Sequence, residues 1–252
     1  MVSLFWDEEG MKMERIKTGI DGLDRLLGGG LPKGSLTIVS GGPGTGKTIL
    51  GIQFLVTGAE RFGEKGLYIS IEQPGEEVIE QARQFGWNMD KLVEENKIRI
   101  VSFDVEKLFE MRWVDEFARL IESDGYDRAV IDSITSLVSS PLTPSRVADA
   151  IESGIQPTAY LEMARANASI LVNRIRKTGI TALGIAEKVD GLPGDTVDRV
   201  SEFKADGLIV LNATAVGKTF IRTIQVKKMR KTKIDGVPHS FDFTENGITL
   251  LE

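Results

Sequence analysis

Residues 36–48, LTIVSGGPGTGKT, decide the fold of this chain. The run 36–40 is apolar or β-branched and predicts a short buried β-strand. Residues 41–48 match the phosphate-binding pattern GxxxxGK[ST]. Apolar residues then recur at helical spacing over 49–61, which predicts a helix. A strand, a glycine-rich loop and a helix in this order are the setting that the motif requires.

The loop has a chemical reason for its spacing. Its glycines allow consecutive backbone N–H groups to turn toward phosphate oxygens, and the following helix directs its positive N-terminal dipole at the same anion. Lys47 is expected to reach the β- and γ-phosphates, and the Thr48 hydroxyl to ligate Mg²⁺. A chance match has odds of about one in a hundred at ordinary residue usage. The predicted ATP-binding residues are Gly41, Gly42, Pro43, Gly44, Thr45, Gly46, Lys47 and Thr48.

Strands and helices continue to alternate along the chain. Strands are predicted at 66–71, 98–103, 128–131 and 180–186, and helices at 74–85, 113–121 and 160–177. This alternation predicts an α/β fold with a mainly parallel central sheet and helices on both faces. After residue 206 the strands follow one another closely, at 207–211, 220–227, 240–243 and 248–251. We expect them to form an antiparallel extension of the same sheet.

The composition excludes several kinds of chemistry. The 252 residues contain no cysteine, which excludes disulfides, zinc-thiolate sites, iron-sulfur clusters and cysteine nucleophiles. The single histidine, His239, argues against a metal site built from histidines. The net charge of −6, from 31 basic and 37 acidic side chains, argues against a wholly basic nucleic-acid wrapper but permits a local basic patch.

The chain also lacks the sequence signals of a membrane or secreted protein. No apolar run approaches the about 18 residues that a membrane-crossing helix needs. The first residues, MVSLFWDEEG, are acidic, unlike the basic start of a secretory signal. We therefore expect a cytoplasmic protein without a membrane partner.

Two acidic residues stand at predicted strand ends. Asp132 follows the apolar strand 128–131, the arrangement that delivers a carboxylate to the Mg²⁺ shell. An aspartate at a strand end is more often a turn or cap residue, but the loop at 41–48 favours the metal role. Glu72 follows the strand 66–71 and is a candidate for polarising the water that attacks the γ-phosphate. A capping or surface glutamate is an equal alternative for Glu72.

A compact basic cluster lies near the C-terminus. It contains Lys227, Lys228, Arg230, Lys231 and Lys233. A solvated charged hairpin, a nucleic-acid contact and a clamp acting on a phosphate bound by another subunit are three interpretations. The third suits an acidic protein with a phosphate loop elsewhere, because a γ-phosphate needs only one or two well-placed cations.

Motifs along most of the chain carry a family resemblance. They are KTGIDGLD at 17–24, GGGLPKG at 28–34, the phosphate loop, YISIEQP at 68–74, FGW at 85–87 and VIDSITS at 130–136. Together they resemble the KaiC-like branch of the RecA-type ATPases, and they are more specific than the phosphate loop alone. The resemblance implies an ATPase domain at 16–252, preceded by an N-terminal arm at 1–15.

What the resemblance implies is a RecA-like core that assembles into a ring, usually a hexamer, with ATP between subunits. Glu72 matches the first of two adjacent glutamates, and Gln73 replaces the second, so hydrolysis is expected to be slow. Lys228 and Arg230 match a Lys-x-Arg motif whose cations reach the γ-phosphate of the adjacent subunit. Better-known members have two tandem copies and a phosphorylatable tail. This chain has one copy, so timekeeping and autokinase activity are not expected of it.

These observations predict a ring-forming regulatory ATPase with an unidentified protein partner. A RecA-like, ATP-dependent DNA-binding protein is one alternative, although DNA is not the favoured partner. A nucleotide-binding scaffold with little hydrolysis is the other. The segment 139–158 contains three prolines and is expected to form a surface loop, with a short helix at 147–152, that faces the ring opening or a partner.

Overall fold

The computed structural model describes residues 13–71, 73–103, 113–123, 125–139, 157–189, 191, 193–217 and 219–251. The strands are β1 (Arg15–Ile16), β2 (Leu31–Pro32), β3 (Leu36–Gly41), β4 (Gly66–Ser70), β5 (Ile98–Ser102), β6 (Arg128–Asp132), β7 (Thr181–Glu187), β8 (Gly207–Val216), β9 (Thr219–Met229), β10 (Pro238–Thr244) and β11 (Gly247–Leu250). The helices are α1 (Asp21–Leu26), α2 (Lys47–Thr57), the π-helix η1 (Gly58–Phe62), α3 (Gly75–Gln84), α4 (Met89–Glu94), α6 (Trp113–Ser123), α7 (Ile134–Ser139), α9 (Pro157–Thr178) and α10 (Ser201–Lys204).

The central sheet has nine strands in the described residues, in the order β11-β10-β9-β8-β3-β7-β6-β4-β5. The strands from β8 through β5 in this order pair in parallel, and β9, β10 and β11 continue the sheet antiparallel to their neighbours. The predicted fold class, a mainly parallel sheet with an antiparallel C-terminal extension, is confirmed. Strands β1 and β2 form a separate two-stranded sheet.

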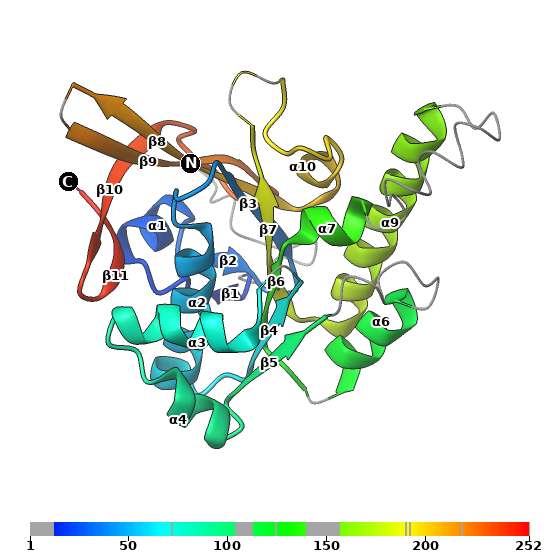
Figure 1. Ribbon diagram of the computed structural model, residues 1–252, viewed down its shortest axis with the longest axis horizontal. Helices are drawn as coiled ribbons and strands as arrows, with labels where there is room; N and C mark the ends of the chain where they lie inside the picture. The colour runs from blue at the N-terminus through cyan, green and yellow to red at the C-terminus, as the bar shows by residue number, and fades with distance from the viewer. Residues whose placement is uncertain are drawn as a thin grey trace.

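Helices cover both faces of this sheet (Figure 1). Helices α1 to α4 lie on one face, and α6, α7, α9 and α10 lie on the other. Successive residues of a strand point to opposite faces, so Val39 of β3 joins the core with Leu50 of α2, while Ile38 joins the core with Leu171 of α9. Both cores contain fully buried aliphatic side chains, which explains why the parallel strands are continuous apolar runs.

Some local predictions differ from the structure. The helix predicted over 49–61 ends as an α-helix at Thr57 and continues as the π-helix η1. The short helices α1, α4, α7 and α10 were not predicted, because four to six residues are too few to establish a helical period. Helix α9 begins at Pro157, inside the predicted loop 139–158. The rest of that segment, with the predicted helix 147–152, and residues 1–12 of the predicted arm lie outside the described residues.

The parallel strands bring their carboxyl ends to one edge of the sheet. Gly41 of β3 pairs with Glu187 of β7, and Asp132 of β6 pairs with Ile185 of the same strand. Residues 42–46 connect β3 to the first residue of α2 at this edge. Such an edge is where parallel α/β sheets bind ligands. In the part of the chain that the structure describes, no helix has the length and apolar character to cross a membrane.

Candidate functional site

The phosphate loop joins β3 to α2 in a conformation that requires glycine. Gly44 and Gly46 have positive φ angles of 70° and 98°. A Cβ atom at Gly46 would lie 2.6 Å from the ring of Phe243, so a side chain is excluded by both backbone strain and packing. Gly46 precedes the first residue of α2, whose first-turn N–H groups have no acceptor within the helix. The loop therefore presents backbone donors as an anion site requires.

Lys47 and Thr45 both bond to one carbonyl of this loop. The Lys47 Nζ atom and the Thr45 Oγ1 atom each donate to the Gly42 carbonyl oxygen at 2.9 Å. These bonds close the loop into a tight turn and hold the Lys47 ammonium beside its backbone. The side chains of Thr45 and Lys47 are thus both held at Gly42, within the predicted phosphate loop.

Asp132 is oriented by two hydroxyl groups. The Thr48 Oγ1 atom donates to Asp132 Oδ2 at 2.9 Å, and the Tyr68 hydroxyl donates to the same oxygen at 2.7 Å. Tyr68 is fully buried in β4, and its ring packs in the core that also contains α2. Sequence reasoning missed Tyr68. The available signal was a tyrosine inside a buried strand, because its hydroxyl needs a partner there.

The loop and Asp132 line a cavity of about 410 Å³. This volume lies within the range of small-molecule sites, about 300–1,000 Å³. Its lining residues are Gly41, Pro43, Gly44, Lys47, Thr48, Gln73, Asp132, Ser133, Ile185, Glu187, Lys188 and Val189.

The donor set at this cavity fits Mg²⁺. Thr48 and Asp132 offer a hydroxyl and a carboxylate oxygen within hydrogen-bond distance of each other. Mg²⁺ prefers oxygen ligands and keeps several waters, so one or two protein ligands plus phosphates suffice. Among the described residues, no group of three or more histidine, cysteine, aspartate or glutamate side chains could form an all-protein metal cage. This agrees with a metal that arrives with a nucleotide.

The predicted catalytic Glu72 lies outside the described residues, and its role stays a prediction. Its neighbour Gln73 lines the cavity, and the Gln73 Oε1 atom accepts a hydrogen bond from Gln81 Nε2 at 3.1 Å. The Ser70 hydroxyl also donates to the Gln73 carbonyl oxygen at 2.5 Å. The chain on the carboxyl side of Glu72 is therefore held against the end of β4.

Lys188 and Asp195 add an ion-pair network that sequence reasoning did not predict. The Lys188 backbone N–H donates to the Gly41 carbonyl oxygen at 3.1 Å. The Lys188 Nζ atom lies 3.2 Å from Asp195 Oδ1, and Lys227 Nζ lies 2.8 Å from the same atom. Burial opposes ionisation of Asp195, but the hydrogen bonds from the two lysines outweigh it and hold the pKa below its usual value. Asp195 therefore connects the cavity wall to β9.

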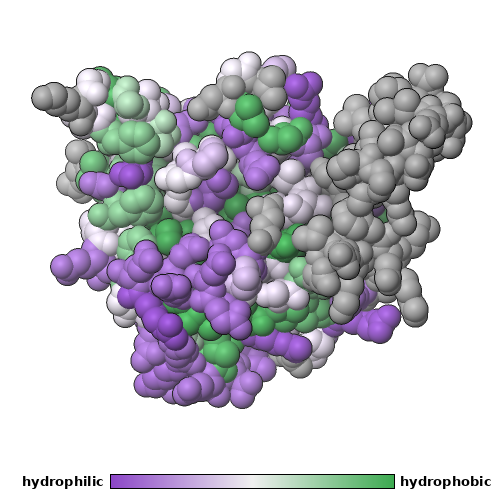
Figure 2. All heavy atoms as spheres, in the orientation of Figure 1, coloured by the Kyte–Doolittle hydropathy of each residue, from purple (hydrophilic) through white to green (hydrophobic). Residues whose placement is uncertain are grey.

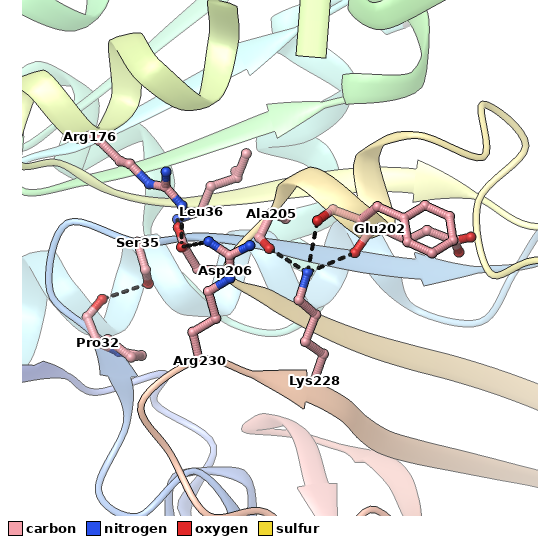
Figure 3. A network of polar contacts seen from close by, with 10 residues as sticks. Pro32, Ser35, Leu36, Arg176, Glu202, Ala205, Asp206, Lys228 and Arg230 are labelled. Carbon is pink, nitrogen blue, oxygen red and sulfur yellow. Dashed lines mark hydrogen bonds and ion pairs between the residues drawn. The ribbon is translucent and has the colours of Figure 1, made fainter. Parts of the chain in front are cut away.

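The other predicted cations, Lys228 and Arg230, lie beside Ala205 and Asp206 (Figure 3), at the edge of the sheet where β8 begins. Gly41, beside the cavity, pairs with Leu211 of β8, whereas the pair to Met229 is Gly207 at the start of β8. The four steps along the strand from Gly207 to Leu211 span about 13 Å, at about 3.3 Å per residue. The structure therefore separates these cations from the phosphate loop of the same chain.

Lys228 and Arg230 have different surroundings. The Lys228 Nζ atom donates to the carbonyl oxygens of Glu202, Phe203 and Ala205 at 3.2, 3.1 and 2.7 Å. An ammonium group has three hydrogens, so these bonds use all of them. Burial, followed by the nearby Arg230 charge, lowers the pKa of Lys228. Arg230 instead projects to an exposed position and lies 3.6 Å from Asp206.

The model of the family described as "ATPase: KaiC" matches residues 16–252. The chain is 31% identical over 249 residues to the circadian clock protein KaiC2 of Synechocystis sp., covering 97% of this chain and 41% of that protein. It is 29% identical to the circadian clock oscillator protein KaiC of Synechococcus elongatus, covering 97% of this chain and 46% of that protein. The chain thus spans less than half the length of these clock relatives.

Two archaeal proteins match over more of their length. A UPF0273 protein of Sulfurisphaera tokodaii is 32% identical, with 95% of this chain and 83% of that protein covered. The crystal structure of a KaiC-like protein from Pyrococcus horikoshii OT3 superimposes with a TM-score of 0.78 at 28% identity, covering 95% of this chain and all of that one. The family match, these relatives and the geometry of the phosphate loop agree, and the chain belongs to the KaiC ATPase family.

Proposed function

We propose that this chain is a cytoplasmic, Mg²⁺-dependent ATPase that hydrolyses ATP slowly in a homo-oligomeric ring, with each nucleotide between two subunits. One observation carries the proposal: the phosphate loop and the Arg230 cation lie at opposite edges of the same sheet. A site that needs both groups is incomplete within one chain. A head-to-tail ring, and a hexamer in particular, supplies the missing group from a neighbour.

Within one chain, the loop 41–48 holds the phosphates and orients them. Thr48 would ligate Mg²⁺ and Asp132 would hold it indirectly; when bound, the ion would supply positive charge to the phosphates. Glu72 orients and deprotonates the attacking water. Gln73 can position groups through its amide, but a neutral amide cannot accept that proton, which makes slow turnover the expected outcome.

Arg230 supplies the cation for the γ-phosphate of the adjacent subunit. Its side chain is 51% exposed, so it is accessible to another chain. We assign Lys228 a supporting role, since its three carbonyl bonds fasten α10 to the strand from which Arg230 projects. A cation of this kind is worth about 10³-fold or more in rate, by analogy with arginine fingers.

The surface offers an apolar area suited to contact with another protein. Figure 2 shows apolar side chains over the β8–β9 hairpin, whereas hydrophilic side chains cover α3 and α4. Val216, Phe220 and Ile221 of this hairpin are all exposed. Exposed apolar groups that gather in one place are typical of protein interfaces. They support assembly with further copies or with an unidentified protein partner.

The basic cluster gives less support to DNA binding. Lys227 is paired with Asp195, and the three hydrogens of the Lys228 ammonium are bonded to carbonyl oxygens. A surface that binds phosphate backbone needs cations whose counterions are released on binding, rather than cations already paired with carboxylates. The ATPase assignment therefore remains the better one.

Subunit mixing tests the interfacial site. Arg230→Ala subunits keep their own phosphate loop, and Lys47→Ala subunits keep their own Arg230. Each variant alone should be nearly inactive, and the re-equilibrated mixture should recover part of the ATPase activity. Sedimentation of each variant confirms that it still assembles. No recovery from two assembling variants would contradict a site shared between chains.

A further inference from the structure

Two arginines share one carboxylate at the amino edge of the sheet (Figure 3). Arg176, in the last turn of α9, places Nη2 at 2.6 Å from Asp206 Oδ1. Arg230, after β9, places Nη1 at 3.6 Å from the same oxygen. The first contact is a hydrogen-bonded ion pair, and the second is too long for a hydrogen bond. Asp206 is therefore bonded to Arg176 and only electrostatically paired with Arg230.

Asp206 cannot follow a departing arginine, because backbone bonds hold it. Its Oδ2 atom accepts from the Leu36 N–H at 3.2 Å, and its own N–H donates to the Leu36 carbonyl at 2.8 Å. The Arg230 N–H also donates to the Asp206 carbonyl oxygen at 2.9 Å. The side chain of Asp206 is only 13% exposed. Asp206 is therefore a fixed and largely buried negative charge beside Arg230.

Both arginines face a basic cavity. Arg176, Asp206 and Arg230 line a cavity of about 800 Å³, together with Lys231 and the ion pair of Lys33 with Glu14, so that four cations face two carboxylates. The Arg230 side chain is 51% exposed and can turn toward an anion brought by another chain, whereas Arg176, 42% exposed, is held by its hydrogen bond to Asp206. The charge of Asp206 opposes the lowering of the Lys228 pKa by burial, but the Lys228 ammonium is directed at three carbonyl groups.

We propose that Arg176 is a positioning residue that keeps Asp206 neutralised, so that Arg230 is free to reach the phosphate bound by the adjacent subunit. This inference rests on the proposed function, in which Arg230 acts between subunits. It adds Arg176 to the residues that support the interfacial ATPase site, and it explains why two arginines lie beside one carboxylate.

The physical reason is the cost of stripping a buried charge. Removing one partner from a buried ion pair leaves the other charge without compensation, which is strongly unfavourable. If Arg230 were the only arginine beside Asp206, its movement to a phosphate would leave the buried Asp206 carboxylate without a cation. With Arg176 bonded at 2.6 Å, Asp206 stays paired when Arg230 moves away.

The test compares ATPase activity and ATP affinity in the assembled protein. Arg176→Ala should lower kcat by about tenfold, at the lower end of the effect of removing a supporting partner. ATP affinity should not change, because the phosphate loop lies at the other edge. Arg176→Lys should retain most of the activity, since it keeps a cation near Asp206. Arg174→Ala, on the same helix but paired with Glu122 at the surface, is the matched control and should turn over like the parent.

The decisive variant is Arg176→Ala combined with Asp206→Asn. The asparagine side-chain oxygen can still accept the Leu36 N–H, but it carries no charge to retain Arg230. The double variant should recover kcat, whereas a merely structural role for Arg176 predicts further loss. An unchanged kcat in Arg176→Ala, or no recovery in a folded and assembled double variant, would overturn the inference.

Arg230→Ala, measured in the same series, separates this inference from the proposed function. If Arg230→Ala is inactive while Arg176→Ala is fully active, only the role of Arg176 is wrong. If Arg230→Ala turns over like the parent, the interfacial mechanism is wrong and the role of Arg176 with it.

Discussion

The Thr48 hydroxyl oxygen lies 2.9 Å from the Asp132 carboxylate, although 84 positions separate the two residues in the chain. Thr48 is the second residue of α2, which follows the loop at the carboxyl end of β3, and Asp132 is the last residue of β6. Parallel strands end at the same edge of a sheet, so the fold brings the two proposed metal ligands together. Tyr68, from β4, completes the arrangement by donating to the same carboxylate oxygen.

Tyr68→Phe should weaken the Mg²⁺ dependence of ATP binding without disturbing the core. The ring keeps its packing, but the 2.7 Å hydrogen bond to Asp132 is lost. Partners that orient a metal ligand typically contribute about 10- to 100-fold in metal affinity. Titration of Mg²⁺ at fixed ATP measures the effect, and Thr48→Ser, which keeps the other hydroxyl, is the control. Equal Mg²⁺ affinity in parent and Tyr68→Phe would mean that Asp132 needs no orienting bond.

Lys47→Ala should abolish ATP binding and leave thermal unfolding nearly unchanged. The Lys47 ammonium belongs to the cavity wall and bonds to a loop carbonyl, so its removal takes no side chain out of the core. Labelled-ATP binding and thermal unfolding are measured on the same sample, with Lys233→Ala as a surface control. Micromolar ATP affinity in Lys47→Ala would contradict the assignment of the loop.

Much of the fold was predictable because its parallel strands are buried on both faces. Runs such as 36–40 and 128–131 are therefore almost wholly apolar, and the residues after them mark one edge of the sheet. The glycine spacing of the loop then identified the strand at which the phosphates bind. Asp132 follows from the same logic, which is why a single sequence predicted its meeting with Thr48.

The ion pairs could not be predicted in this way. Asp195 lies 32 positions from Lys227, and Asp206 lies 30 positions from Arg176. No periodicity connects such partners. The meeting of Asp206 with Arg176 depends on where the end of α9 lies against the residues before β8. The meeting of Asp195 with Lys227 depends on the pairing of β9 with β8, whose register shifts by a bulge at Leu208–Ile209. A shift of one residue changes which side chains face each other, and the sequence carries no signal for it.

Glu64→Ala should destabilise the protein by about 3 kcal/mol, the cost of leaving a buried charge without its partner. Arg128 has a side chain that is only 1% exposed, and it pairs with Glu64. It also donates to the carbonyl oxygens of Lys17 and Phe54, both at 2.7 Å. Urea unfolding measures the change, and the exposed Glu60→Ala is the control. A decrease of less than about 1 kcal/mol in the free energy of unfolding, as for a surface ion pair, would show that the two carbonyl groups are enough to compensate the Arg128 charge.

Asp195→Asn should lower stability at pH 7 and make no difference in strong acid. The lysine hydrogen bonds hold the folded-state pKa of Asp195 below its usual value of about 3.9. A lowered pKa means that this carboxylate stabilises the fold above about pH 4, and that its contribution is lost as the pH falls through the folded value. Unfolding free energies are measured from pH 7 downward, with the exposed Asp242→Asn as control. A parent–variant difference that persists at all pH values would exclude ionisation as its cause.

Lys228→Ala should lower stability more than Arg230→Ala does, and Arg230→Ala should lower turnover more than Lys228→Ala does. Loss of the Lys228 ammonium removes the donor to three carbonyls around α10, and each unsatisfied polar group costs about 1–3 kcal/mol when buried. Loss of Arg230 removes an exposed pair at 3.6 Å from Asp206, worth at most about 1 kcal/mol.

Turnover should follow the reverse order, because only the Arg230 guanidinium can reach a neighbouring phosphate without breaking carbonyl hydrogen bonds. Urea unfolding and ATPase assays on both variants give the two comparisons. If Lys228→Ala is as stable as the parent and loses as much turnover as Arg230→Ala, the carbonyl bonds are broken on assembly. Lys228 would then act on the neighbour's nucleotide together with Arg230. Its hydrogen bonds to the carbonyl groups around α10 would exist only in the unassembled subunit.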